Sequence, residues 1–155
     1  MRRTDREITD NVLIYSIIQK ADVCRLALVD NGIPYIVVLN FGCVQGDSNC
    51  LYFHCANEGR KIDIIKQNNQ VCFQMDVEHE LITAKKACGY TMNFKSLVGY
   101  GKINIVSTKE GKVQGLNVIM KQYTQQDQFE YSDKMLDITT ILKLEIEQIT
   151  AKQQI

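Results

Sequence analysis

The stretch of residues 52–61 holds the side chains of this chain that are best suited to bind an anion. Strand-like alternation gives way there to helical spacing, so a helix would begin close to Gly59. The first N–H groups of a helix lack intrahelical acceptors and carry the positive end of its dipole, and a glycine lets an oxyanion approach them. Arg60 adds a planar fork of donors, and Lys61 adds a point charge. The pattern predicts a phosphate-binding site.

The same residues allow a simpler interpretation, in which Arg60 and Lys61 are two solvated charges on a surface helix. A strand followed by Gly-Arg-Lys is only moderately specific. The spacing alone therefore favours the surface interpretation, and other motifs must decide between the two.

His54 ends the strand beside this segment. A single histidine is more often packed or capped than catalytic, but an imidazole changes charge near neutral pH and can donate a proton to a neighbouring ligand. His79, between Glu78 and Glu80, is expected only to be paired and solvated. The sequence has no Ser-His-Asp arrangement, P-loop or Gly-x-Gly-x-x-Gly motif, so no motif supports a hydrolase or a nucleoside-triphosphate enzyme.

Composition predicts one folded domain over residues 1–155, because apolar residues make up 45% of the chain and charged residues 23%. Eighteen basic residues balance eighteen acidic ones, so no net field draws the protein to nucleic acid or to an anionic membrane. No signal-peptide core or membrane-length apolar run is present. We therefore expect a cytoplasmic protein that acts on a small molecule.

The six cysteines are expected to stay reduced in that compartment. None forms a Cys-x-x-Cys pair, and those at positions 24, 50, 55 and 72 fall within apolar strands, where a thiol packs as a small hydrophobe. Only His79 and Cys88 share a neighbourhood. No metal site is expected.

Hydrophobic periodicity then places the elements that must position these groups. Period-two alternation predicts six strands, at residues 24–28, 35–41, 50–55, 71–77, 94–106 and 142–147. Helical spacing predicts helices over residues 10–20, 59–66 and 113–123, with Asp10 or Thr9 capping the first and Asn57 the second. Asn31-Gly32 predicts a tight hairpin. Together these elements predict an α+β, mainly β fold, a small antiparallel barrel with inserted helices.

Residues 35–41 differ from the other strands because they are apolar on both faces. Protein can cover one face, and a ligand or a partner subunit the other. A barrel of this size cannot by itself bury a drug-sized ligand. We therefore expect a homodimer.

Motifs along most of the chain resemble the nitroimidazole-resistance branch of the pyridoxamine 5'-phosphate oxidase-like flavoproteins. These motifs are Cys-Arg-Leu-Ala-Leu at 24–28, Pro-Tyr-Ile-Val at 34–37, Leu-Asn-Phe-Gly at 39–42, Tyr-Phe-His at 52–54, Glu-Gly-Arg-Lys at 58–61, Ala-Cys at 87–88, Val-Gly-Tyr-Gly at 98–101 and Met-Lys-Gln-Tyr at 120–123. The resemblance implies a six-stranded antiparallel Greek-key split barrel. It also implies a flavin, FMN or alternatively FAD, in a groove between two subunits.

The resemblance also assigns residues to the flavin site. Arg60 and Lys61, with Gly59, would hold the phosphate, His54 and Cys55 would lie at the phosphate end, and Ser96 would reach the flavin from the partner subunit. The strand along the ring and ribityl chain would supply Tyr35, Ile36, Val37, Val38, Leu39 and Asn40. Val38 and Asn69 stand where relatives usually have proline, and neither change removes a ligand.

Two features bear on the activity. The C-terminal segment 150–155 lacks the Arg and Pro motif that binds pyridoxal substrates in the oxidase, so pyridoxamine phosphate oxidation is not expected. The resemblance implies an FMN-dependent oxidoreductase that reduces small nitroaromatic or nitroimidazole-type compounds, with His54 as a catalytic proton donor. The alternatives are a haem-binding or haem-degrading split barrel, with His54 as an iron ligand, and a non-enzymatic flavin carrier or sensor.

Overall fold

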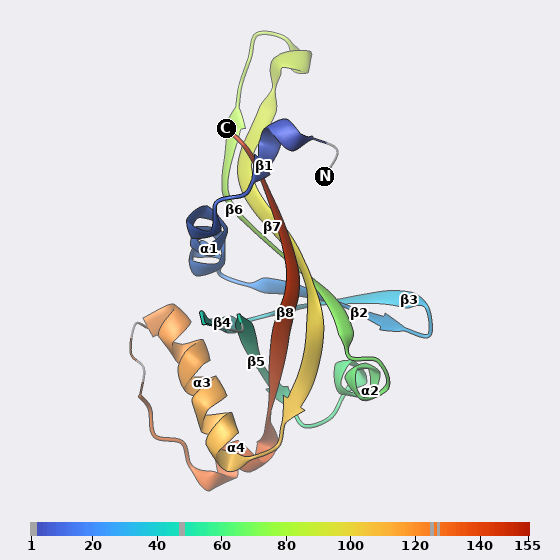
Figure 1. Ribbon diagram of the computed structural model, residues 1–155, viewed down its shortest axis with the longest axis vertical. Helices are drawn as coiled ribbons and strands as arrows, with labels where there is room; N and C mark the ends of the chain where they lie inside the picture. The colour runs from blue at the N-terminus through green and yellow to red at the C-terminus, as the bar shows by residue number, and fades with distance from the viewer. Residues whose placement is uncertain (1–2, 47–48, 125, 127) are drawn as a thin grey trace.

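A computed structural model of the chain describes residues 3–46, 49–124, 126 and 128–155. Eight antiparallel strands form its sheet, in the order β3-β2-β6-β7-β8-β5-β4, with β1 also paired to β8 (Figure 1). The strands are β1 Glu7–Ile8, β2 Cys24–Asp30, β3 Ile33–Leu39, β4 Phe41–Val44, β5 Cys50–Ala56, β6 Gln70–Ile82, β7 Thr91–Val106 and β8 Thr139–Gln154. Its α-helices are α1 Asn11–Lys20, α2 Arg60–Gln67, α3 Lys109–Thr124 and α4 Asp133–Ile138, with short 3-10 turns at Thr4–Arg6 and Ala87–Gly89.

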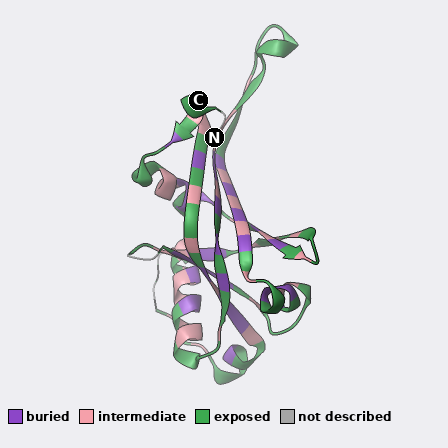
Figure 2. Cartoon of the chain, turned by 45° about the vertical axis from the view of Figure 1, so that its right-hand side comes forward, coloured by how far each residue is buried: buried purple, intermediate pink, exposed green. Residues whose placement is uncertain are grey.

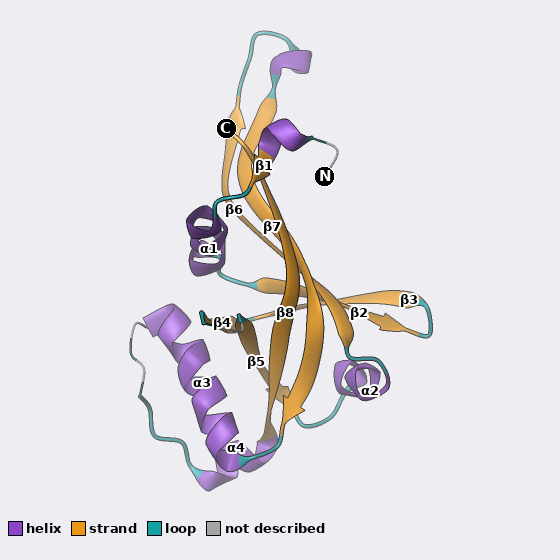
Figure 3. Ribbon diagram, in the orientation of Figure 1, coloured by secondary structure: helices purple, strands orange, loops and turns teal. Residues whose placement is uncertain are grey.

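The predicted α+β, mainly β fold is confirmed, but the expected number of strands was too low (Figure 3). The six expected strands are β2, β3, β5, β6, β7 and β8; the short strands β1 and β4 and the helix α4 were not predicted. The strand expected over 35–41 ends at Leu39, and Phe41 begins β4. Segments as short as β1 and β4 carry too few residues for a periodic signal, and only pairing with β8 and β5 makes them strands.

Local signals in the sequence set two of the connections. The Asp10 carboxylate caps α1 by accepting from the Val12 N–H at 2.8 Å. Asn31 and Gly32 join β2 to β3 with φ angles of 50° and 85°, both in the left-handed region that this two-residue hairpin requires. Both predictions are confirmed.

The predicted cap of α2 was wrong, because Gly59 and not Asn57 is the N-cap residue. The side chain of Asn57 instead ties the end of β5 to the start of β8. Its Nδ2 donates to the Asp137 carbonyl at 2.5 Å, and its Oδ1 accepts from the Thr140 hydroxyl at 2.8 Å. These two contacts come from residues 80 and 83 positions away, so the helix-start pattern alone did not indicate them.

Two apolar cores lie on opposite faces of the sheet. The larger core contains the inward faces of most strands and is covered in part by α1 and α2. The smaller core lies between α3 and the other face of β5 and β8 (Figure 1). Gly42 permits this packing, since a Cβ there would lie 2.3 Å from the Val118 carbonyl oxygen in α3. The strand β5 is therefore buried on both faces for most of its length.

The hairpin of β6 and β7 extends beyond the cores as an arm, and its tip is exposed (Figure 2). A bulge in β6 lies at the base of the arm, where Glu78 has a φ of 58°. The ammonium groups of Lys20 and Lys95 both bind the Glu78 carboxylate, and these bonds hold its pKa at about 2. Among the described residues, no helix has the length and apolar character needed to cross a membrane.

Candidate functional site

The N-terminus of α2 is held in place by the main core. Ile62, Ile64 and Ile65 are buried there, which fixes the short helix against β2. Gly59 precedes it with a φ of 125°, a conformation that favours glycine, and a Cβ at this position would meet no atom within 4 Å. The Gly59 carbonyl accepts the N–H groups of Ile62 and Asp63. An open space thus lies beside the first turn of α2.

Arg60 lies against the β2–β3 hairpin. Its Nη2 and Nε lie 3.0 and 3.1 Å from Oδ2 of Asp30, the last residue of β2. The guanidinium carbon lies 4.5 Å from the centroid of the Tyr35 ring in β3, within range of a cation–π contact. The structure therefore brings together Arg60 and Tyr35, two of the predicted site residues, and adds Asp30.

Cys55, near the end of β5, lies close enough to Lys61 to feel its charge. Burial raises the pKa of the Cys55 thiol, and the positive charge of Lys61 opposes that shift. Cys55 is therefore a protonated thiol at neutral pH, and its half-buried position suits packing against a ligand better than nucleophilic attack.

The strand β3 has one covered face and one bare face. Tyr35, Val37 and Leu39 pack partly against the main core. On the other face Ile36 is 62% exposed and Val38 59% exposed. Protein covers one face, as expected from the sequence, and no residue that the structure describes covers the other. Asn40 follows as an exposed residue between β3 and β4.

His54 lies on the opposite face of β5 from Cys55. Its Cα partner across β8 is Ile141, which belongs to the smaller core under α3. Facing residues on neighbouring strands share a face of the sheet, so His54 shares that side with Ile141. The His54 side chain is exposed. The structure thus does not group His54 with Lys61 and Cys55 within one chain.

Ser96 lies in the middle of β7 and is only 9% exposed. Its register partners are Asp76 in β6 and Lys152 in β8. Two strands, β2 and β6, separate β7 from β3, so Ser96 and the residues of β3 lie about 14 Å apart across the sheet. Within one subunit it does not join the group around Arg60.

Sequence reasoning missed two acidic residues, Asp30 and Asp76. Asp76 pairs with Arg25 at 2.6 Å and with His79 at 2.7 Å, so the pairing expected for His79 has Asp76 as its partner. No local signal could have found the contacts with Arg25 and Arg60, because these cations lie 51 and 30 residues away, in β2 and α2. Among the described residues, no group of three or more potential ligands gathers as a metal site.

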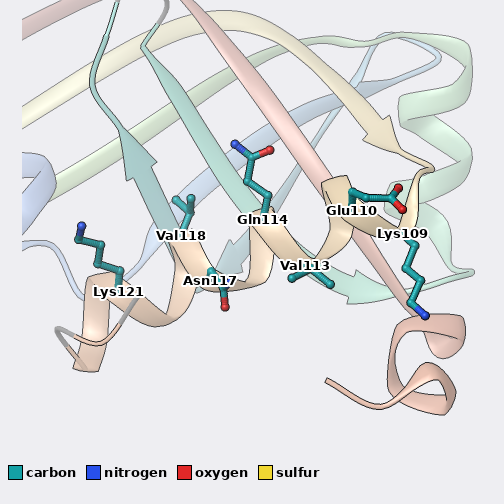
Figure 4. A pocket seen from close by; sticks show the side chains of 7 residues that line it. All are labelled: Lys109, Glu110, Val113, Gln114, Asn117, Val118 and Lys121. Atoms are coloured by element: carbon teal, nitrogen blue, oxygen red, sulfur yellow. The ribbon is translucent and has the colours of Figure 1, made fainter. Parts of the chain in front are cut away.

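A cavity of about 640 Å³ runs along α3, away from the residues above (Figure 4). Its lining side chains all come from that helix, from Lys109 to Lys121, and include Val113 and Val118. Lys109 is paired with Asp133, and Asn117 accepts the Tyr131 hydroxyl. None of the predicted site residues lines it, so the α2 N-terminus remains the candidate site.

Comparison with known proteins identifies the class of this fold. A family model described as pyridoxamine 5'-phosphate oxidase matches residues 10–153. The chain therefore belongs to that family, and its antiparallel sheet with inserted helices is the family's split barrel. Among curated proteins, none matches the chain.

Three solved structures define its neighbours more closely. A candidate 5-nitroimidazole antibiotic resistance protein from Bacteroides thetaiotaomicron is 36% identical, with a TM-score of 0.83 over 95% of this chain and 86% of that one. An FAD-binding protein from Mesorhizobium loti is 22% identical, with a TM-score of 0.67 and coverage of 97% and 98%. An FAD and haem binding protein from Mycobacterium smegmatis is 14% identical, with a TM-score of 0.82 and coverage of 96% and 73%. The latter two share the fold.

The cysteine environments lead to a prediction about thiol reactivity. Burial raises the pKa of Cys43, Cys50, Cys55 and Cys72, and that of Cys24 to about 12, whereas Cys88 is exposed on the arm. Because the thiolate is the reactive form, iodoacetamide near neutral pH should modify Cys88 first and Cys55 only slowly. Mass spectrometry of timed samples measures this, and Cys88→Ser should remove the fast phase. Rapid labelling of Cys55 would contradict our assignment of a neutral thiol.

Proposed function

We propose that this protein binds FMN by its phosphate at the N-terminus of α2 and acts as an oxidoreductase on small nitroaromatic compounds. The observation that carries the proposal is the open space beside Gly59 at the start of a helix that is anchored in the core and has Arg60 and Lys61 in its first turn. The 36% identity to a candidate nitroimidazole resistance protein supports the substrate class.

The donor groups at the N-terminus of α2 fit the phosphate of FMN. Ile62 and Asp63 donate to the Gly59 carbonyl, and the earlier N–H groups of a helix have no acceptor within it. They are available to phosphate oxygens, as are the Lys61 ammonium and the free donors of Arg60. Gly59 and the open space beside it would let a phosphate approach the backbone.

In this proposal the ring of the flavin would be enclosed only when a second subunit is present. Ile36 and Val38 expose an apolar edge strand that a stable soluble protein would cover. A partner subunit that packs against this face would form one wall of the groove and would bring its own Ser96 toward the ring. The bound flavin would supply the transfer of electrons, and the chain would orient it, exclude water and tune it.

FAD remains open as the cofactor, since the fold neighbour from Mesorhizobium loti is described as FAD-binding. The absorption spectrum of the purified protein separates a flavin from a haem, and mass spectrometry of the chromophore released on denaturation separates FMN from FAD. A flavin that is not reoxidised by any nitro compound would indicate a carrier or sensor.

The double variant Arg60→Ala, Lys61→Ala should lose FMN. Each charge-assisted hydrogen bond lost costs about 1.5–3 kcal/mol, which is roughly tenfold or more in affinity. The matched control is Lys66→Ala, which removes a cation from the last turn of the same helix and should bind FMN normally. Flavin titration measures affinity, and thermal unfolding checks that the apo variants stay folded. Unchanged affinity in the double variant would show that Arg60 and Lys61 are surface charges only.

A charge introduced on β3 should disrupt the proposed subunit interface. Ile36→Asp should convert the dimer to a monomer and weaken flavin binding, because a carboxylate would have to be buried in the interface. Ile138→Asp is the matched control, since Ile138 is 63% exposed on α4 and Ile36 62% exposed on β3. Light scattering at micromolar concentration measures the mass. A flavin-loaded monomer of the unchanged chain would refute the proposed dimer.

Because His54 does not lie beside Lys61 and Cys55 within one chain, we propose that it protonates at the flavin held by the partner subunit, so His54→Ala should keep the flavin but slow the reduction of a nitro substrate. General acid assistance is worth on the order of 100-fold in rate, whereas the phosphate contacts do not involve this side chain. His79→Ala is the control, because His79 is already paired with Asp76. Steady-state turnover with bound-flavin absorbance measures both properties. Equal turnover in His54→Ala and the unchanged protein would leave His54 a surface residue.

A further inference from the structure

We propose that Asp30 is a positioning residue for the phosphate site, because it holds one edge of the Arg60 guanidinium and turns the other edge toward the phosphate. This inference rests on the proposed binding of FMN. It concerns a residue at the end of β2 that lies thirty positions before Arg60 and is no part of the strand-to-helix motif.

The contacts divide the guanidinium into a used edge and a free edge. Nε donates its hydrogen to Asp30 Oδ2 at 3.1 Å, and Nη2 lies 3.0 Å from the same oxygen as an ion pair. A guanidinium has five N–H groups, so both hydrogens of Nη1 and the second hydrogen of Nη2 remain. One hydrogen of Nη1 and one of Nη2 lie side by side along the outer edge of the group, the geometry that binds two oxygens of one phosphate. Asp30 therefore does not block the phosphate.

The Tyr35 ring supplies the second constraint. The guanidinium carbon lies 4.5 Å from the ring centroid, so the planar group rests on the ring. Asp30 fixes which edge of the plane faces the hairpin, and Tyr35 fixes the plane itself. A long side chain that would otherwise sample many rotamers is thus oriented before the ligand arrives, and less entropy is lost when it binds.

Asp30 is itself held by the hairpin turn. Its Oδ1 accepts from the Asn31 side-chain amide at 3.0 Å, while Oδ2 accepts from Arg60. Its side chain is 26% exposed and that of Arg60 55% exposed. The backbone around it is set by Asn31 and Gly32 in left-handed conformations. The turn, the carboxylate and the guanidinium thus form one chain of contacts that ends at the phosphate site.

Asp30 also brings a negative charge near an anion site, which opposes phosphate binding. The guanidinium lies between the two anions, and the site is partly exposed, so solvent and salt screen that repulsion. The hydrogen bond and the ion pair that join Asp30 to Arg60 act over about 3 Å and are therefore screened less than that repulsion. We therefore expect orientation to outweigh repulsion.

The test compares FMN with riboflavin, which has the same ring and ribityl chain without the phosphate. Asp30→Ala should lower the affinity for FMN about tenfold, the loss expected for one charge-assisted contact, and leave riboflavin affinity unchanged. Asp30→Asn keeps an oxygen acceptor and should bind FMN more tightly than Asp30→Ala. Asp22→Ala removes an exposed carboxylate elsewhere and should behave like the unchanged chain.

A second pair of variants tests whether Asp30 acts through Arg60. In an Arg60→Ala background, Asp30→Ala should have no further effect on FMN, because the group that it orients is gone. Additive losses would overturn the proposal. So would unchanged FMN affinity in Asp30→Ala, tighter FMN binding in Asp30→Asn than in the unchanged chain, or equal losses for FMN and riboflavin, which would indicate damage to the hairpin. Equal affinity of the unchanged chain for FMN and riboflavin would instead refute phosphate binding itself.

Discussion

The burial of three isoleucines from one short helix is the interaction on which the candidate site depends. An isolated helix of eight residues is not stable in water, since nucleation costs more than so few hydrogen bonds return. Burial of each isoleucine side chain contributes about 1.5–3 kcal/mol, and Ile62, Ile64 and Ile65 are all buried. The main core therefore creates the helix end, and with it the unpaired N–H groups beside Gly59. The polar site is a consequence of apolar packing on the other side of the same helix.

The two faces of the sheet are buried to different extents, and this leaves one side of β3 bare. The strand β5 lies between the main core and α3, whereas the outer face of β3 is left bare by the described residues. A rigid strand with one bare apolar face is costly in a free monomer but suitable as a wall for a flat ring or a partner subunit. Tyr35 links this strand to the phosphate end, because it lies on the opposite face of β3 and supports the Arg60 guanidinium. The two ends of the proposed groove are thus coupled through a single hairpin.

Several cations near the sheet form ion pairs with carboxylates away from the start of α2. Arg25 and Lys95 bind carboxylates of β6, and Lys20 reaches the same strand from α1. At the start of α2, Arg60 forms an ion pair with Asp30, and the charge of Lys61 lowers the raised pKa of Cys55. Since the chain has no net charge, the two adjacent cations at the start of α2 reflect the arrangement of residues and not the composition.

The sequence by itself determined the features that depend on neighbours within a few positions. The Asp10 cap, the Asn31-Gly32 turn, the alternation of the six longer strands and the start of a helix after Gly59 are all local, because backbone conformation and periodicity are encoded over a turn or two. The motifs also indicated the family, which the comparison then confirmed. The ranges predicted for β6, β7 and β8 were shorter than the strands themselves. The outer parts of these strands alternate weakly, and they are strands because they pair with one another.

Tertiary structure alone decided which of these groups meet. Asp30 and Arg60 are thirty residues apart, and their contact depends on how α2 docks beside β2. The face that His54 occupies depends on β5 being covered on one side by the main core and on the other by α3. The sequence pattern indicated Asn57 as a helix cap. Its side chain instead binds Asp137 and Thr140, which lie 80 and 83 positions further along the chain. Such choices follow from register and packing, which join segments that no local pattern relates.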